Sequence, residues 1–181
     1  MSPISALWGN IFKKQNEDHH DVHFLLKKLP LFAGLNKGEL REIERLVHHR
    51  RYRDGEVIFW EDEPGVGMYI VQDGEVGIFK DYAKTGQKEL ALLAPGDFFG
   101  EMALLEDDTR SATAVARGDV HLFGLIHPEL FNLFDRKPHL GVQLLSSLAN
   151  IMARRLRKTN QDLQLLTRNA LAVETPRKTA P

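Results

Sequence analysis

Apolar residues at the start of the chain recur at helical spacing, and two further helical patterns follow. The first pattern predicts a short amphipathic helix, formed by Ile4, Leu7, Trp8, Ile11 and Phe12. A second short helix is expected over Val22–Leu29, after a polar break at Asn16–Asp21 and before Pro30. Asn36 followed by Glu39 has the sequence of an N-cap and its capping-box partner, which predicts the start of a third helix.

From His49 onward the pattern changes to the short runs typical of β-strands. The expected strands are Arg50–Arg53, Glu56–Trp60, Met68–Gln72, Glu75–Lys80, Glu89–Leu93, Ser111–Ala116 and Val120–Ile126. Asp73-Gly74 stands between two of these runs and predicts a β-hairpin. About eight short strands without a crossover helix predict a sandwich, a barrel or a roll, and they exclude a parallel βαβ sheet.

Helical spacing returns after Ile126, with a short helix expected over Glu129–Asp135 and a long helix from about Leu140 to Thr167. The long helix carries two apolar stripes: a heptad of Val142, Leu145, Ala149, Met152, Leu156, Thr159, Leu163 and Leu166, and a second row of Leu144, Leu148 and Ile151. One stripe suits the core and the other a partner, so we expect a homodimer through this helix. A single wide stripe that faces the core is the alternative.

The order of these patterns indicates an α+β protein with one β unit. We expect amphipathic helices over residues 1–30, the β unit over 31–137, the long helix over 138–167 and a disordered tail over 168–181.

Composition narrows the possible functions. The chain of 181 residues has no cysteine, which excludes disulfides, thiol catalysis and zinc–thiolate sites. Its net charge of −1 argues against a general polyanion binder. The first residues lack the apolar core of a signal peptide, and no run of about 18 apolar residues occurs, so we expect a cytoplasmic protein. We expect the N-terminal helix to dock on the protein itself, with a partner protein or, last, a membrane surface as alternatives.

One segment, Pro95–Thr113, combines groups that suit an anion joined to a sugar. Gly100 lets the backbone approach a ligand closely, and Glu101–Leu105 reads as one helical turn whose free N–H groups attract an anion. Arg110 adds a cation with a planar fork suited to phosphate oxygens. The Glu101 carboxylate repels phosphate but accepts hydrogen bonds from hydroxyls such as those of ribose. This combination indicates a singly charged phosphodiester joined to a sugar, which is the chemistry of a 3′,5′-cyclic nucleotide.

The same segment resembles a known family. Phe99-Gly-Glu-Met-Ala-Leu104 followed by Arg110-Ser-Ala-Thr113 is similar to the phosphate-binding cassette of cyclic-nucleotide-binding domains. These domains occur in catabolite-activator-type regulators, protein kinase A regulatory subunits and gated ion channels. The resemblance implies an eight-stranded antiparallel β-roll, a jelly-roll-like double-stranded β-helix, flanked by N-terminal helices and a long C-terminal helix.

The resemblance also implies which residues contact the ligand. Glu101 is expected to accept the ribose 2′-hydroxyl, and Arg110 to pair with the phosphate. Ser111 is expected to bond the phosphate or a guanine base, and Leu93 to line the base pocket. Backbone N–H groups are expected near the sugar and phosphate at three positions: Gly100, Met102 and Ala103.

The run Met152–Thr159 is similar to the central helix of catabolite-activator-type dimers. By this resemblance Thr159 and Asn160 are expected to read the base, and Arg155 to brace Glu101. Thr159 favours cyclic AMP as the ligand, whereas Ser111 leaves cyclic GMP open.

These observations predict a cyclic AMP sensor that signals to a downstream protein by ligand-dependent movement of its C-terminal helix. We expect no catalysis, no cofactor, no metal site and no DNA binding, because too few residues follow the long helix to form a helix-turn-helix. The first alternative is a degenerate domain that serves as an interaction scaffold, with Glu101 and Arg110 paired to each other. The second is a cupin-type metal enzyme, for which the strands offer only His49 and His121, while His19, His20 and His23 suit a solvated surface.

Overall fold

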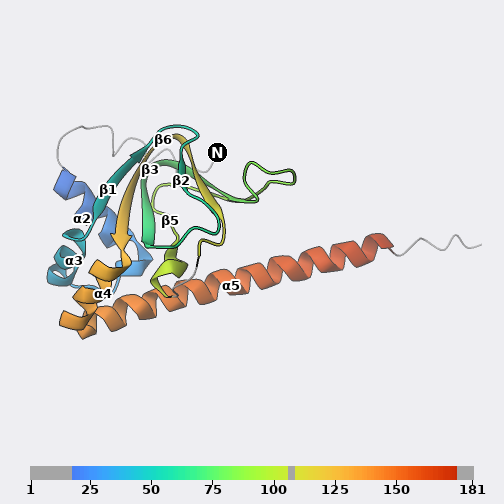
Figure 1. Ribbon diagram of the computed structural model, residues 1–181. Helices are drawn as coiled ribbons and strands as arrows, with labels where there is room; N and C mark the ends of the chain where they lie inside the picture. Colours follow the sequence, from blue (N-terminus) through green and yellow to red (C-terminus); the bar gives the residue numbers. More distant parts are fainter. Residues whose placement is uncertain (1–17, 106–108, 175–181) are drawn as a thin grey trace, which may run out of the picture.

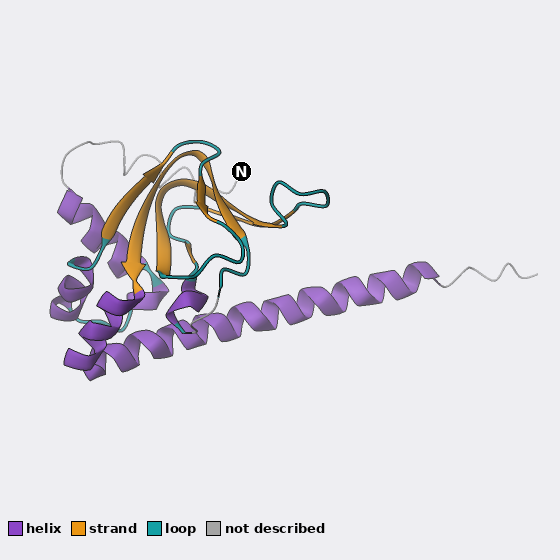
Figure 2. Cartoon of the chain, viewed as in Figure 1, coloured by secondary structure: helices purple, strands orange, loops and turns teal. Residues whose placement is uncertain are grey.

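The computed structural model describes residues 18–105 and 109–174, so the helix expected around Ile4–Phe12 lies outside the described residues. Short helices gather at one end of an antiparallel β-roll, and a single long helix runs beneath the roll and extends beyond it (Figure 1). Figure 2 shows the same view by secondary structure, with the strands forming one curved body. The expected α+β class with an antiparallel β-roll is confirmed.

Two helices and a 3-10 turn precede the sheet: α2 (Asp18–Lys28), η1 (Pro30–Phe32) and α3 (Lys37–Glu44). Helix α2 begins inside the stretch expected to be a polar break. The predicted capping box of α3 is confirmed. The Asn36 side chain accepts bonds from the N–H groups of Gly38 and Glu39, and the Glu39 side chain accepts one from the N–H of Asn36.

The sheet contains six strands: β1 (His48–Tyr52), β2 (Val57–Phe59), β3 (Gly67–Lys80), β4 (Lys88–Leu93), β5 (Phe98–Phe99) and β6 (Thr113–Ile126). Their order is β1-β6-β3-β4, with β2 also paired to β6 and β5 also paired to β3, and every pairing is antiparallel. The long strands β3 and β6 each contain two of the predicted runs, which reconciles the observed strands with the expected number.

The hairpin predicted at Asp73-Gly74 is wrong. Both flanking runs belong to β3 and pair with β6 instead of with each other. The register shifts on either side of Asp73, and Gly74 has a φ of +81° with room for no side chain, since a Cβ there would lie 2.4 Å from the carbonyl oxygen of Asp119. The dipeptide therefore bends one long strand, in the manner of a β-bulge, and helps to curl the sheet into a roll.

The molecule has two apolar cores. The larger lies between the helices and the roll, where η1 and α2 meet α4 (His127–Arg136) and α5 (Pro138–Glu174). The smaller fills the inside of the roll and includes Val71, Val76, Phe99, Ala114, Ala116, Val120 and Leu122. Leu144 and Leu148 of α5 are fully buried in the larger core, so the second apolar stripe of this helix packs as predicted.

The far half of α5 has a different environment. Every residue from Ala153 to Leu165 is exposed, and the helix projects away from the roll (Figure 1). It continues to Glu174, beyond the predicted end at Thr167, because no proline interrupts the chain before Pro176. The predicted heptad stripe is thus left largely open to solvent, with exposed fractions of 61% at Leu156 and 60% at Leu163.

Over residues 18–105 and 109–174, no helix combines the length and the apolar character needed to cross a membrane.

Candidate functional site

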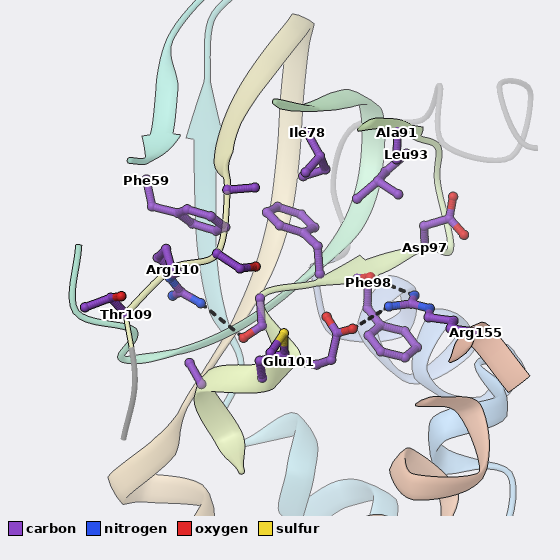
Figure 3. Close-up of a pocket in the computed structure, with 16 residues that line it drawn as sticks. Phe59, Ile78, Ala91, Leu93, Asp97, Phe98, Glu101, Thr109, Arg110 and Arg155 are labelled. Atoms are coloured by element: carbon purple, nitrogen blue, oxygen red, sulfur yellow. Dashed lines mark hydrogen bonds and ion pairs between the residues drawn. The ribbon is translucent and has the colours of Figure 1, made fainter. Parts of the chain in front are cut away.

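A cavity of about 440 Å³ opens between the roll, η2 (Glu101–Leu104) and the middle of α5 (Figure 3). Cavities of this size hold small-molecule ligands. Its lining comes from β2, β3 and β4, from the segment that contains η2, from the residues directly before β6, and from α5. The residues are Phe59, Ile78, Ala91, Leu93, Asp97, Phe98, Phe99, Gly100, Glu101, Met102, Ala103, Thr109, Arg110, Ser111, Ala112 and Arg155.

Gly100 is required by two independent features of this site. Its φ of +71° lies in the left-handed region, which glycine adopts without steric cost. A Cβ at this position would also lie only 2.6 Å from Nη1 of Arg110. The absence of a side chain therefore lets the guanidinium pack directly against the backbone before η2.

Arg110 is a buried cation on the wall of the cavity, with an exposed fraction of 5%. Its Nη1 donates to the carbonyl oxygen of Gly100 at 3.1 Å, and its guanidinium carbon lies 4.2 Å from the ring centroid of Phe59. Burial lowers the pKa of Arg110, although an arginine remains charged at neutral pH. A cation held out of water in this way attracts an anion strongly.

The polar atoms of Arg110 are not all satisfied. Its Nε is buried and has no hydrogen-bond partner among the described residues, and within that part of the chain Arg110 forms no ion pair. An unpaired buried donor is costly, because it has lost its bonds to water and gained none in return. An anion that contacts the guanidinium from the cavity would offset part of the cost of burying this charge.

Glu101 is paired with α5 and not with Arg110. Nη1 of Arg155 contacts Oε1 of Glu101 at 2.5 Å, and Nη2 of Arg155 donates to the carbonyl oxygen of Phe98 at 3.1 Å (Figure 3). The Arg155 guanidinium also lies 4.6 Å from the ring centroid of Phe98. The expected brace between Arg155 and Glu101 is therefore present, and it ties the cavity to the long helix.

The segment after Gly100 forms the expected helical turn, as the 3-10 helix η2. The first N–H groups of such a turn have no acceptor within the helix, because no helical residue precedes them to offer a carbonyl group. Met102 is 46% exposed at the cavity and Ala103 is buried. The N–H of Ala103 already donates to the carbonyl oxygen of Gly100 at 3.3 Å, so the backbone donors left for a ligand in this turn are those before Ala103.

One wall of the cavity is apolar. Leu93 and Ala91 from β4 lie beside Ile78 from β3 (Figure 3). The ring of Phe59, over which the Arg110 guanidinium lies, belongs to a cluster with Tyr69 and Phe99, with centroids 5.6 Å apart for Tyr69–Phe99 and 5.8 Å apart for Phe59–Phe99. An apolar wall and a buried cation in one cavity suit a ligand with a ring at one end and an anion at the other.

Sequence reasoning placed most of the candidate residues at this cavity. Seven of them line it: Leu93, Gly100, Glu101, Met102, Ala103, Arg110 and Ser111. It missed Phe59, Ile78 and Asp97, which come from other strands and turns. The alternation of side chains along a predicted strand indicates which residues point into the roll. It does not indicate which strands lie around the cavity.

Thr159 and Asn160 do not line the cavity. Both are exposed on α5, one turn beyond Arg155, and the Thr159 hydroxyl donates to the carbonyl oxygen of Arg155 at 3.1 Å. Because side chains four positions apart share one face of a helix, Thr159 lies on the same side as Arg155. The contact of these two residues with a base stays a prediction.

Comparison with known proteins supplies the class. Residues 49–137 match the family model of the cyclic nucleotide-binding domain. A solved structure, the N-terminal domain of a transcriptional regulator from Streptomyces coelicolor A3(2), is 30% identical with a TM-score of 0.65, and the match covers 77% of this chain and 94% of that one. The chain belongs to the cyclic nucleotide-binding domain family.

Two relatives give the kinds of protein in which a similar sequence is found. The cyclic AMP receptor protein of Thermus thermophilus is 37% identical over 142 residues, which cover 78% of this chain and 64% of the relative. The cAMP-dependent protein kinase regulatory subunit of Hypocrea atroviridis is 34% identical over 125 residues, which cover 65% of this chain and 26% of the relative. The chain spans less than two thirds of the length of either protein. The first is named as a receptor protein and the second as a regulatory subunit.

Proposed function

We propose that this protein binds a cyclic nucleotide, cyclic AMP in preference to cyclic GMP, and transmits the bound state to a partner protein through α5. The observation that carries the proposal is the buried Arg110, whose Nε has no partner among the described residues and whose guanidinium borders an open cavity. The cyclic AMP named in both relatives supports adenine as the base.

Each part of a cyclic nucleotide has a matching group in the cavity. The phosphodiester anion would pair with Arg110 and accept bonds from the backbone at η2. The ribose 2′-hydroxyl would donate to Glu101, whose carboxylate oxygens have acceptor capacity beyond the bond to Arg155. The base would pack against the apolar wall formed by Ile78, Ala91 and Leu93.

Glu101 supplies a route from the ligand to α5, because it would contact the ribose and already contacts Arg155. A ligand that changes the position of Glu101 also changes the best position of Arg155, and with it the placement of the helix. Switching a two-state protein almost completely takes a preference of about 5.5 kcal/mol for one state. Hydrogen bonds to charged groups contribute about 1.5–3 kcal/mol each, so contacts at Arg110, Glu101 and Thr159 together would supply a preference of that size.

The proposal includes a homodimer formed through α5. The heptad positions Leu156 and Leu163 are 61% and 60% exposed, and pairing two such helices would bury them. The basic residues Arg154, Arg157 and Lys158 do not fall on the heptad positions, so they would face away from the seam. Pairing would also bring Thr159 and Asn160 of two subunits together near the cavity side of the helix.

Titration calorimetry on the purified protein tests nucleotide binding. We expect saturable binding of cyclic AMP at one site per chain and weaker binding of cyclic GMP. Arg110→Ala is expected to weaken cyclic AMP binding by about 100-fold, the loss that follows from removing a charge-assisted bond. The matched control is Arg117→Ala, because Arg117, like Arg110, packs against a phenylalanine ring but lies on β6 outside this cavity.

Two outcomes of this calorimetry would contradict the proposed function. If the unaltered protein binds neither nucleotide, the scaffold alternative replaces the sensor. If it binds cyclic AMP and Arg110→Ala binds equally well, the nucleotide does not occupy the cavity as proposed. An unchanged thermal midpoint for Arg110→Ala shows in either case that the fold is intact.

A further inference from the structure

The backbone of Arg110 is hydrogen-bonded to the loop that follows β2. The N–H of Arg110 donates to the carbonyl oxygen of Glu63 at 2.8 Å, and the N–H of Asp62 donates to the carbonyl oxygen of Arg110 at 2.9 Å. The direction in which Arg110 leaves the backbone therefore depends on the conformation of residues 61–63.

That loop has an unusual backbone. Asp62 has a φ of +68°, in the left-handed region that residues with a side chain seldom adopt. Such a conformation carries a cost and persists where neighbouring contacts fix it. Glu61, the residue directly before Asp62, makes side-chain contacts to other parts of the chain.

Glu61 makes three contacts that join different strands. Its carboxylate forms an ion pair with the ammonium of Lys80 and accepts a bond from the N–H of Asp81 at 3.1 Å. Its own N–H donates to the hydroxyl oxygen of Thr113 at 3.0 Å, at the start of β6. The Glu61 side chain is 12% exposed and that of Lys80 is 47% exposed, so the pair lies at the surface with its carboxylate turned inward.

Lys80 completes the arrangement from the end of β3. Besides its ion pair with Glu61, its ammonium donates to the carbonyl oxygen of Ser111 at 3.2 Å, and Ser111 directly follows Arg110. The bond from Lys80 lowers the pKa of Glu61, so both groups are charged at neutral pH. Because the two charges offset each other, the pair adds little net electric field at the cavity. Its effect on the site would come from the backbone that it holds in place.

We propose that the ion pair of Glu61 and Lys80, here called the Glu61–Lys80 clamp, fixes the backbone on both sides of Arg110 and so aims its guanidinium into the cavity. Glu61 and Lys80 are positioning residues for anion binding. The consequence for affinity rests on the proposed function, whereas the effect on Arg110 itself does not.

Two variants test the clamp by calorimetry with cyclic AMP. Lys80→Met removes the ammonium while keeping the length of the chain, and Glu61→Gln keeps the shape while removing the charge. Each is expected to bind cyclic AMP about tenfold more weakly, since each removes a bond to a charged group. Lys80→Arg is expected to restore affinity to within about threefold of the unaltered protein, because it keeps donors for Glu61 and Ser111. The control is Lys84→Met, because Lys84 is an exposed lysine in the turn after β3 whose ion pair is with Asp81.

A second measurement separates positioning from a general loss of stability. Proton–nitrogen NMR reports the Nε–H resonance of Arg110, identified by its absence in Arg110→Lys. We expect this resonance to shift or broaden in Lys80→Met and Glu61→Gln, with and without cyclic AMP, and to stay unchanged in Lys84→Met. Wild-type affinity in both clamp variants, or an unchanged Nε–H resonance in them, overturns the inference. If the unaltered protein binds no nucleotide, the proposed function fails, and the resonance in the free protein still decides whether the clamp acts on Arg110.

Discussion

Gly100 and Arg110, ten positions apart in the chain, depend on each other for their conformation. The guanidinium of Arg110 occupies the space where a side chain of residue 100 would begin, at 2.6 Å from an added Cβ. In exchange, the carbonyl oxygen of Gly100 accepts a bond from that guanidinium at 3.1 Å. One small residue therefore permits the approach of the cation and also helps to hold it in place.

Gly100→Ala is expected to impair both the fold and the site. An L-residue at positive φ costs about 1 kcal/mol or more of folding stability. The added methyl group must also displace the Arg110 guanidinium, so we expect cyclic AMP affinity to fall by at least about tenfold. Thermal denaturation and calorimetry measure the two effects.

Gly118→Ala is the matched control for this variant. Gly118 has a nearly identical φ of +73°, but a Cβ there would meet no atom within 4 Å. It should lose similar backbone stability and retain affinity for cyclic AMP. Equal losses of affinity in the two variants would contradict the role given to residue 100.

At the scale of single residues, the sequence predicted the part of the site that is contiguous in the chain. Gly100, Glu101 and Arg110 belong to one segment, and the chemistry of each is evident from its residue type. Thr159 was assigned because the run Met152–Thr159 resembles the central helix of catabolite-activator-type dimers, and the structure leaves it exposed on α5, one turn beyond Arg155. No residue type reveals how far a long helix runs past a cavity.

At the scale of elements, the short helix α3 depends on its cap. It has only eight residues, too few to be stable alone, and the Asn36–Glu39 box satisfies N–H groups at its first turn. Asn36→Ala is expected to lower the free energy of unfolding by about 1 kcal/mol. Cyclic AMP affinity should not change, because α3 does not line the cavity.

Chemical denaturation with Asn150→Ala as the control checks this prediction. Asn150 is an exposed asparagine inside α5, where its side chain caps no helix. It should not reduce stability, since alanine is the better helix former in a helix interior. A loss of the same size in both variants would show that the cost does not come from the cap.

The elements that sequence reasoning missed or misread share one cause. Strand β5 has two residues, too few for any alternation to be visible, and it exists because Phe98 and Phe99 pair with β3. Asp73-Gly74 has the composition of a tight turn, yet the partner strand β6 accepts both flanking runs and makes the dipeptide a bend. Local composition predicts that the chain turns; only pairing between distant strands decides by how much.

At the scale of the whole molecule, the open heptad of α5 determines how chains would associate. Leu163→Asp places a charge in the proposed seam, where burial in a dimer would leave it unpaired. We expect this variant to be monomeric at concentrations where the unaltered protein is a dimer. Light scattering coupled to size-exclusion chromatography measures the mass.

Leu165→Asp is the control for association. Leu165 is 57% exposed, close to the 60% of Leu163, but it lies off the heptad positions. It should leave the mass of the assembly unchanged. If both variants dissociate, or if the unaltered protein is itself monomeric, the proposed dimer through α5 is wrong.

The exposed length of α5 gives the molecule a lever arm. Beyond Arg155, no hydrogen bond or ion pair ties the described part of this helix to the roll. At about 1.5 Å per residue, the stretch from Arg155 to Glu174 reaches roughly 28 Å, so a tilt of about 10° at Arg155 would carry the far end through about 5 Å. A sub-ångström change beside a bound sugar would thus be magnified to a displacement large enough for another protein to detect.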